Sequence, residues 1–196
     1  TQIGKECHHG CEIFQKMGEC IMPTNGVFAK VLHGGKISVG DEFHVQYRAA
    51  VITLSDTASK GEREDASGAA VEEIVGKEGY EVVFKKIIPD DGDTLTALLC
   101  ELSDEDKADL ILTTGGTGFS KRDNTPEATM RAVERETPGI SEAMRYYSLQ
   151  ITPRAMLSRA ASVIRGRTLI VNLPGSPKAV RESLDFVLPN LYHGLD

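Results

Sequence analysis

The feature that most constrains the fold is an alternation of short apolar runs and amphipathic segments that begins at residue 49. Apolar stretches, typical of strands buried on both faces of a sheet, predict strands at residues 49–54, 80–88 and 109–114. Between them, residues 66–78 show helical spacing and end at Gly79. A second helix is predicted from the stripe of Leu95, Leu98, Leu99 and Leu102, with Asp93 as its N-cap.

The C-terminal half continues this alternation. Thr125-Pro126 predicts the start of a helix that Pro138-Gly139 ends, and shorter helices follow at residues 141–149 and 153–160. Residues 163–173 predict a strand pair that turns at 165–167, and Ser176-Pro177 opens the last helix. Strand–helix alternation of this kind predicts an α/β fold, with a mostly parallel sheet and helices on both faces.

The chain divides near residue 48. Residues 1–48 hold three of the four cysteines and four of the five histidines and carry no net charge, so the whole net charge of -7 belongs to residues 49–196. In the first segment, residues 26–32 and 37–39 flank the turn residues 33–36, which is typical of a β-hairpin. We therefore expect a small β-rich N-terminal segment before the α/β domain.

The loop after the third strand is rich in glycine, hydroxyl and basic residues. It runs from Thr113 through Gly115, Gly116 and Gly118 to Lys121 and Arg122. Glycines let backbone N–H groups approach an anion, so the loop is a candidate phosphate cradle, although a flexible strand-to-helix turn is an equal alternative. It is neither a Walker A loop nor a dinucleotide fingerprint.

Acidic residues follow the other strands. Pro89-Asp90-Asp91-Gly92-Asp93 offers carboxylates for a divalent cation such as Mg²⁺, although Asp-Gly turns are ordinary. Ser55-Asp56 ends the first strand, and residues 172–177 follow the last one. Because ligands bind at the carboxyl ends of parallel strands, we expect all four segments to gather at one sheet edge. Carboxylates beside a phosphate cradle favour metal-assisted phosphoryl or nucleotidyl transfer.

Ordered motifs from about Ala49 to the C-terminus resemble those of one family. They are Ser55-Asp56, Pro89-Asp90, Thr114-Gly115-Gly116-Thr117-Gly118, Arg122-Asp123, Thr125-Pro126, Pro138-Gly139, Leu157-Ser158-Arg159 and Asn172-Leu173-Pro174-Gly175-Ser176-Pro177. This pattern resembles the Mog-type molybdopterin adenylyltransferases, which include the G domain of gephyrin. The resemblance implies the molybdopterin-binding fold and transfer of an adenylyl group from Mg-ATP to molybdopterin, with release of pyrophosphate.

The resemblance also implies roles for single residues. Asp90 and Asp123 correspond to essential acidic positions and would be catalytic residues and Mg²⁺ ligands. The implied substrate-binding residues are Ser55, Asp56, Thr114, Gly115, Gly116, Thr117, Gly118, Ser158, Pro174, Gly175 and Ser176. A homotrimer and a molybdenum-insertion enzyme as partner are expected by the same analogy. A non-catalytic molybdopterin-binding or carrier module is the alternative, since one fold serves several functions.

Residues 1–48 resemble the C-terminal third of a MOSC domain, through Gly4-Lys5-Glu6-Cys7, Cys20-Ile21-Met22-Pro23, Gly26-Val27-Phe28-Ala29 and Gly40-Asp41. The resemblance implies a sulfur-carrying Cys7 in a complete module. As an alternative, Cys7-His8-His9-Gly10-Cys11 with Cys20 offers zinc ligands, although the spacing is not standard. Cys100 is predicted to be a small core residue.

The composition excludes several classes of function. The acidic balance, 22 Lys and Arg against 29 Asp and Glu, argues against nucleic acid or an anionic membrane as a partner. No apolar run approaches the roughly 20 residues that span a bilayer. The first residues lack the order of a signal peptide, so a cytoplasmic protein is expected.

Overall fold

The computed structural model describes residues 2–3, 27–28, 34–36, 38–40 and 46–195. Two compact units divide the chain, Thr1–His44 and Val45–Asp196. In the first unit, β1 (Gln2–Ile3) pairs antiparallel with β2 (Val27–Phe28), and residues 39–40 form a turn. The predicted hairpin is therefore not borne out in the described residues: Val27–Phe28 pairs with Gln2–Ile3, and residues 34–36 and 38–40 are not strand. The cluster of Cys7, His8, His9, Cys11 and Cys20 lies outside the described residues.

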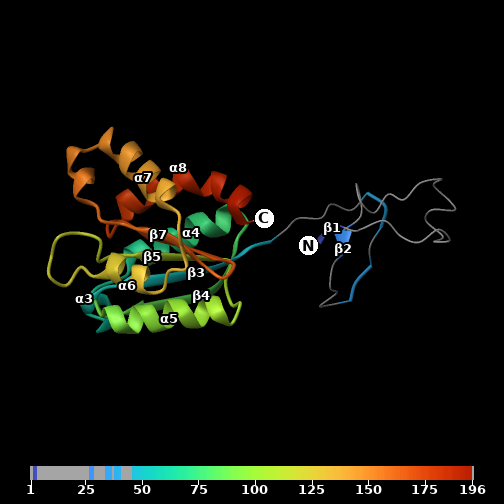
Figure 1. Cartoon of the computed structure of the whole chain (residues 1–196), viewed down its shortest axis with the longest axis horizontal. Coiled ribbons are helices and arrows are strands. Elements are labelled where there is room, and N and C mark those ends of the chain that lie inside the picture. Colours follow the sequence, from blue (N-terminus) through green and yellow to red (C-terminus); the bar gives the residue numbers. More distant parts are fainter. Residues whose placement is uncertain (1, 4–26, 29–33, 37, 41–45, 196) are drawn as a thin grey trace. The chain divides into compact units, whose positions relative to one another are not determined.

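The second unit contains strands and helices interspersed along the chain (Figure 1). Its strands are β3 (Arg48–Leu54), β4 (Glu81–Ile88), β5 (Leu110–Thr114), β6 (Arg135–Glu136), β7 (Ser162–Arg165) and β8 (Thr168–Leu173). Its helices are α3 (Asp56–Ser59), α4 (Ala66–Lys77), α5 (Gly92–Asp104), α6 (Thr125–Arg131), α7 (Pro138–Leu149), the 3₁₀ helix η1 (Pro153–Leu157) and α8 (Pro177–Leu195).

The strands form one six-stranded sheet in the order β4-β3-β5-β8-β7-β6. The first four are mutually parallel, whereas β7 runs antiparallel to both β8 and β6. The predicted fold class, a mostly parallel sheet in an α/β domain, is therefore confirmed. The β7–β8 pair turns at Gly166, whose φ of +57° suits a residue without a side chain.

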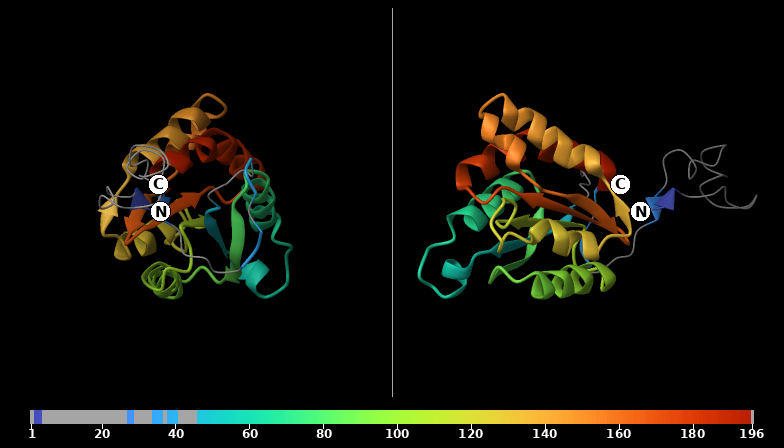
Figure 2. Two further views of the ribbon diagram at one scale, coloured as in Figure 1. Left: turned by 90° about the vertical axis from the view of Figure 1, so that its right-hand side faces the viewer. Right: turned by 60° about the vertical axis from the view of Figure 1, so that its left-hand side comes forward.

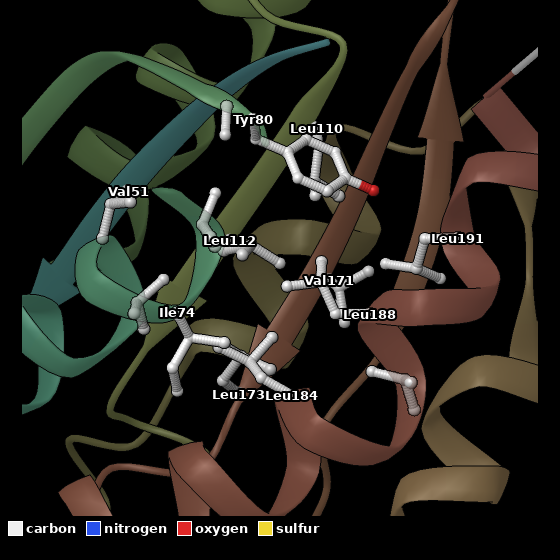
Figure 3. Packing of buried hydrophobic residues seen from close by; sticks show 14 of the residues in the cluster. Val51, Ile74, Tyr80, Leu110, Leu112, Val171, Leu173, Leu184, Leu188 and Leu191 are labelled. Atoms are coloured by element: carbon white, nitrogen blue, oxygen red, sulfur yellow. The ribbon is translucent and has the colours of Figure 1, made fainter. Parts of the chain in front are cut away.

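Helices cover both faces of this sheet, because successive side chains of each buried strand point to opposite sides. Val51, Leu112 and Val171 face α4, α7 and α8, and Figure 3 shows them packing against Ile74, Leu184 and Leu188. The intervening residues of the same strands, such as Ile52, Ile111 and Ile170, face α5 and α6. Both views in Figure 2 show α5 and the orange and red helices on opposite sides of the sheet. Cys100, as predicted, packs against the apolar residues on the α5 and α6 side of the sheet.

Three predicted helix boundaries are wrong. The N-cap of α5 is Asp91 and not Asp93, because Asp91 is extended and its carboxylate accepts hydrogen bonds from the amides of Asp93 (3.2 Å) and Thr94 (3.4 Å). Asp93 lies in the first turn and pairs with Arg131 instead, at 2.9 Å.

The second error concerns Pro138-Gly139, which begins α7 and does not end the preceding helix. That helix, α6, stops at Arg131, and the short strand β6 separates it from α7. A proline is tolerated in the first turn of a helix because its missing N–H has no intrahelical partner there. The helix predicted at 153–160 is the shorter η1.

Candidate active site

The candidate site lies at the carboxyl ends of the four parallel strands, where four loops meet. Hydrogen bonds join the loop after β3 to the loop after β4. The segment after β5 bonds to the loop after β3 through Arg122, and Thr114 at the end of β5 bonds to the loop after β8. Figure 1 shows the long loop between β5 and α6 on the same side as α3. The four segments therefore lie at one edge of the sheet, as the parallel order of the strands predicts.

Asp56 and Asp90 hold the first two loops together by a reciprocal pair of hydrogen bonds. The Asp56 amide donates to Oδ2 of Asp90, and the Asp90 amide donates to Oδ1 of Asp56, both at 3.1 Å. Nη2 of Arg122 lies 2.7 Å and 2.6 Å from the two carboxylate oxygens of Asp56. The basic end of the glycine loop is thereby tied to the acidic turns.

The site carries more negative than positive charge. Burial raises the pKa of the Asp90 carboxyl, the hydrogen bond from the Asp56 amide opposes this, and the negative charges of Asp56 and Asp123 raise it further against the influence of Arg122. Asp90 and Asp123 are therefore close enough to interact electrostatically. An added cation would relieve this repulsion.

The carboxylate oxygens of Asp90 and Asp123 are ligands of the kind that Mg²⁺ prefers. In the described part of the chain, no group of three or more His, Cys, Asp or Glu side chains is arranged to hold a metal ion. Mg²⁺ needs only one or two carboxylates when substrate phosphates and water complete its shell. Oδ2 of Asp123 accepts the Ser120 amide at 2.9 Å and Oδ2 of Asp90 accepts the Asp56 amide, which leaves one oxygen of each carboxylate for a ligand.

The glycine loop needs its glycines for two different reasons. Gly115 and Gly116 have φ values of +98° and +64°, in the region that L-residues avoid. A Cβ at Gly115 would also lie 2.3 Å from the carbonyl oxygen of Leu54, and one at Gly116 would lie 2.4 Å from Oγ1 of Thr125. Thr125 in turn donates to the Gly115 carbonyl at 2.9 Å. The backbone of the loop is therefore packed directly onto the end of β3.

The segment after β8 forms a wall beside this loop. Oγ1 of Thr114 donates to the Pro174 carbonyl at 2.7 Å, and Oγ of Ser67 donates to the Gly175 carbonyl at 2.8 Å. The Oγ of Ser176 accepts the Ala179 amide at 3.2 Å and so caps the start of α8. For Ser176, the structure supplies a capping partner within the helix.

Residues of the glycine loop line several cavities. A polar cavity of about 110 Å³ is lined by Ser55, Thr114, Gly115 and Gly175, among others. A larger one of about 290 Å³ is lined by Thr117, Gly118, Ser158 and Pro174 together with residues of α7, η1 and α8. We call the hydrogen-bonded loops that hold Asp56, Asp90 and Asp123 the acidic side of the site, and the 290 Å³ cavity that Ser158 lines its pocket side.

The family model described as "Probable molybdopterin binding domain" matches residues 50–193, more than half of the chain. The protein belongs to this family. A molybdopterin adenylyltransferase of Helicobacter pylori is 42% identical over 148 residues, which make up 74% of this chain and 84% of that protein. Gephyrin of Dictyostelium discoideum is 40% identical over 160 residues, 76% of this chain and 22% of gephyrin.

A solved structure agrees with this assignment. The molybdopterin biosynthesis enzyme MoaB of Thermus thermophilus superposes with a TM-score of 0.72 at 46% identity, covering 76% of this chain and 94% of that one. The predicted membership of the molybdopterin-binding family and the predicted fold are confirmed. The roles predicted for individual residues remain predictions.

Several residues of this molybdopterin-binding domain were given no role from the sequence, although Arg159 lies in the motif Leu157-Ser158-Arg159. Arg145 donates to the Ala160 carbonyl at 2.8 Å, and the fully buried Ser183 lines the 290 Å³ cavity from α8. Arg159 contacts the glycine loop through several groups. An isolated arginine or serine on a helix or in a loop has no local pattern that identifies such contacts, so only the three-dimensional arrangement reveals them.

Proposed function

We propose that the second unit is a molybdopterin adenylyltransferase of molybdenum cofactor biosynthesis. A phosphate oxygen of molybdopterin attacks the α-phosphorus of ATP, the bond from that phosphorus to the oxygen bridging the β-phosphate breaks, and pyrophosphate leaves. The observation that carries the proposal is that the Asp56 and Asp90 turns bond to each other and are tied by Arg122 to the glycine loop, whose Thr117 and Gly118 line a cavity with Ser158.

The loop residues bind phosphate in this proposal. Left-handed Gly115 and Gly116 let the backbone turn tightly, so that amide groups of residues 115–118 can donate to phosphate oxygens. The reciprocal bonds between Asp56 and Asp90, with Arg122, fix the acidic turns against this loop. Such fixed dipoles and charges favour a transition state because they need not reorganise during the reaction.

Asp90 and Asp123 are the residues that would hold Mg²⁺. When bound, Mg²⁺ supplies positive charge that neutralises the triphosphate and the repulsion between the two carboxylates. On the pocket side of the site, Ser158 and Pro174 line the cavity in which the pterin end of the substrate would lie.

The adenylyltransferase is favoured over a non-catalytic carrier module. Simple phosphate binding would be opposed by neighbouring carboxylates, and the negative charges of Asp56 and Asp123 both act to raise the pKa of Asp90. The Helicobacter pylori relative, 42% identical, is an adenylyltransferase. A carrier would bind molybdopterin without releasing pyrophosphate from ATP.

The test is release of pyrophosphate from Mg-ATP, dependent on added molybdopterin, by the full chain and by Asp123→Ala. Asp123 is half-buried in a loop outside the hydrophobic core, so we expect the variant to keep the fold while turnover falls by at least about 10²-fold. Asp185→Ala, which removes an exposed carboxylate from α8, is the matched control and should turn over as the wild type does. Near-normal turnover by Asp123→Ala would refute the role assigned to this residue.

The chain is further proposed to assemble as a cytoplasmic homotrimer that hands its product to a molybdenum-insertion enzyme. Five large apolar side chains between residues 146 and 157 are exposed: Tyr146 (70%), Leu149 (42%), Ile151 (45%), Met156 (64%) and Leu157 (46%). Apolar surface gathered in this way is typical of an interface between subunits.

In the described residues, no helix is long and apolar enough to cross a membrane. Light scattering after gel filtration will give the mass of the assembly, and a monomer would contradict the trimer.

For residues 1–48 we propose descent from the last third of a MOSC domain. In a MOSC domain that includes this part, Cys7 would be the residue that carries sulfur. Elemental analysis of the purified protein tests the alternative zinc site of Cys7, His8, His9, Cys11 and Cys20. Stoichiometric zinc would favour that alternative.

A further inference from the structure

Arg159 joins the two ends of the exposed part of the glycine loop. Its Nε donates to the Gly118 carbonyl at 2.7 Å, and its Nη2 donates to the Asp123 carbonyl. Residues 119–122, between these two carbonyls, are exposed, and Phe119 alone is 69% accessible. One guanidinium group therefore fixes the distance between the start of this segment and the backbone of Asp123.

The position of Arg159 is itself fixed by the core of the sheet. Its own amide donates to the Thr117 carbonyl at 3.0 Å. Two residues later, Ala161 exchanges hydrogen bonds with the buried Asn172 of β8, whose Nδ2 also donates to Thr113 of β5 and to Thr129. The guanidinium therefore projects from a backbone segment anchored to the two central strands.

The same stretch of chain serves both sides of the site. Ser158, directly before Arg159, lines the 290 Å³ cavity, whereas the Arg159 side chain points to the carbonyl of Asp123. A third contact, to the carboxylate of Glu127, orients the planar guanidinium. An ammonium group in this place could not donate to two carbonyls and a carboxylate with the geometry of a guanidinium fork.

We propose that Arg159 is a positioning residue for adenylyl transfer: it clamps the Gly118 and Asp123 carbonyls so that the Asp123 carboxylate is held at a set distance from the cavity beside Ser158. The inference rests on the proposed adenylyltransferase function and adds to it a residue that touches neither substrate. Its role is to keep the acidic side and the pocket side of the site in register.

The test compares Arg159→Lys with Arg165→Lys in the full chain. Arg165 is a matched control because it also donates to a carboxylate, that of Asp104, and to a carbonyl, that of Ala132, away from the four loops. Their side chains are 32% and 23% exposed. We expect Arg159→Lys to lower kcat for pyrophosphate release about 10²-fold while the KM for ATP changes little, because a misplacement of about 1 Å can cost that much. Arg165→Lys should keep the wild-type kcat.

A second measurement does not depend on activity. Trypsin cleaves after Lys121 and Arg122, inside the segment that Arg159 clamps. Under native conditions, Arg159→Lys should be cut there faster than the wild type and Arg165→Lys, as followed by mass spectrometry. A wild-type enzyme without turnover would overturn the proposed function, whereas unchanged cleavage would overturn the clamp itself. Wild-type kcat in Arg159→Lys, or an equal loss of kcat in Arg165→Lys, would overturn the positioning role.

Discussion

Replacing Gly115 by alanine tests the account of the glycine loop most directly, because the structure predicts two separate costs. The first is conformational: an alanine at φ +98° lies outside the regions that L-residues populate, which costs about 1–3 kcal/mol. The second is steric, since the new Cβ would lie 2.3 Å from the Leu54 carbonyl oxygen, closer than the 3.0 Å that real Cβ atoms essentially never pass. The neighbour is backbone of a buried strand, so relief requires a shift that costs about 1–3 kcal/mol more.

Gly115→Ala should therefore lower the free energy of unfolding by about 2–6 kcal/mol, a large part of the roughly 5–15 kcal/mol of a typical domain. Gly166→Ala is the matched control. Gly166 also has a positive φ, +57°, but a Cβ added there would meet no heavy atom within 4 Å beyond its own chain neighbours. This variant should lose only the conformational part, about 1–2 kcal/mol.

The assay is urea unfolding followed by far-UV circular dichroism, with wild type and both variants measured in one buffer. The difference between the two variants isolates the clash with Leu54, provided that the denaturant dependence of unfolding is the same for all three. Equal stabilities of Gly115→Ala and Gly166→Ala, within about 0.5 kcal/mol, would refute the claim that the loop is packed onto the end of β3.

Three further outcomes are expected. Asn172→Leu should lower the free energy of unfolding by about 2–4 kcal/mol in urea unfolding, because the buried side-chain amide forms hydrogen bonds with three neighbours. The control is Asn190→Ala at an exposed position, which should lose less than about 0.5 kcal/mol. An equally small loss in Asn172→Leu would contradict the prediction. Burial acts to raise the pKa of Asp109, but hydrogen bonds from Arg48 outweigh it, so the pKa is lowered. The ion pair therefore stabilises the fold above the unfolded pKa of about 3.9, and this stabilisation is lost as pH falls through the folded pKa. In unfolding measured against pH, Asp109→Asn should thus be less stable than wild type at neutral pH, with a gap that closes in acid; a constant gap would argue against the ion pair. Leu184→Ala should cost about 2–5 kcal/mol by thermal or urea unfolding, because this side chain is fully buried between α8 and the sheet, and a loss under about 1 kcal/mol would mean that the face is loosely packed.

The pattern of apolar residues in the sequence was enough to predict most helices and strands, and it also predicted that the loops after the parallel strands lie together. Apolar runs such as 49–54 predict buried strands, and helical stripes such as that of Leu95 and Leu99 predict the crossovers between them. Since right-handed crossovers make the strands parallel, their carboxyl ends must share one edge. Residues as far apart as Asp56 and Asp90 could therefore be assigned to one site without coordinates.

The boundaries around residues 126–138 and the contacts within the site were decided by tertiary structure. A proline suits the region after one helix as well as the first turn of the next, and only the pairing of β6 with β7 separates α6 from α7. The hydrogen bonds exchanged by Asp56 and Asp90, and those from Arg159 to the Gly118 and Asp123 carbonyls, each join a side chain to a backbone group. Almost every residue carries such backbone groups, so the sequence does not show which of them a given side chain will meet. That choice follows from how the folded loops approach one another.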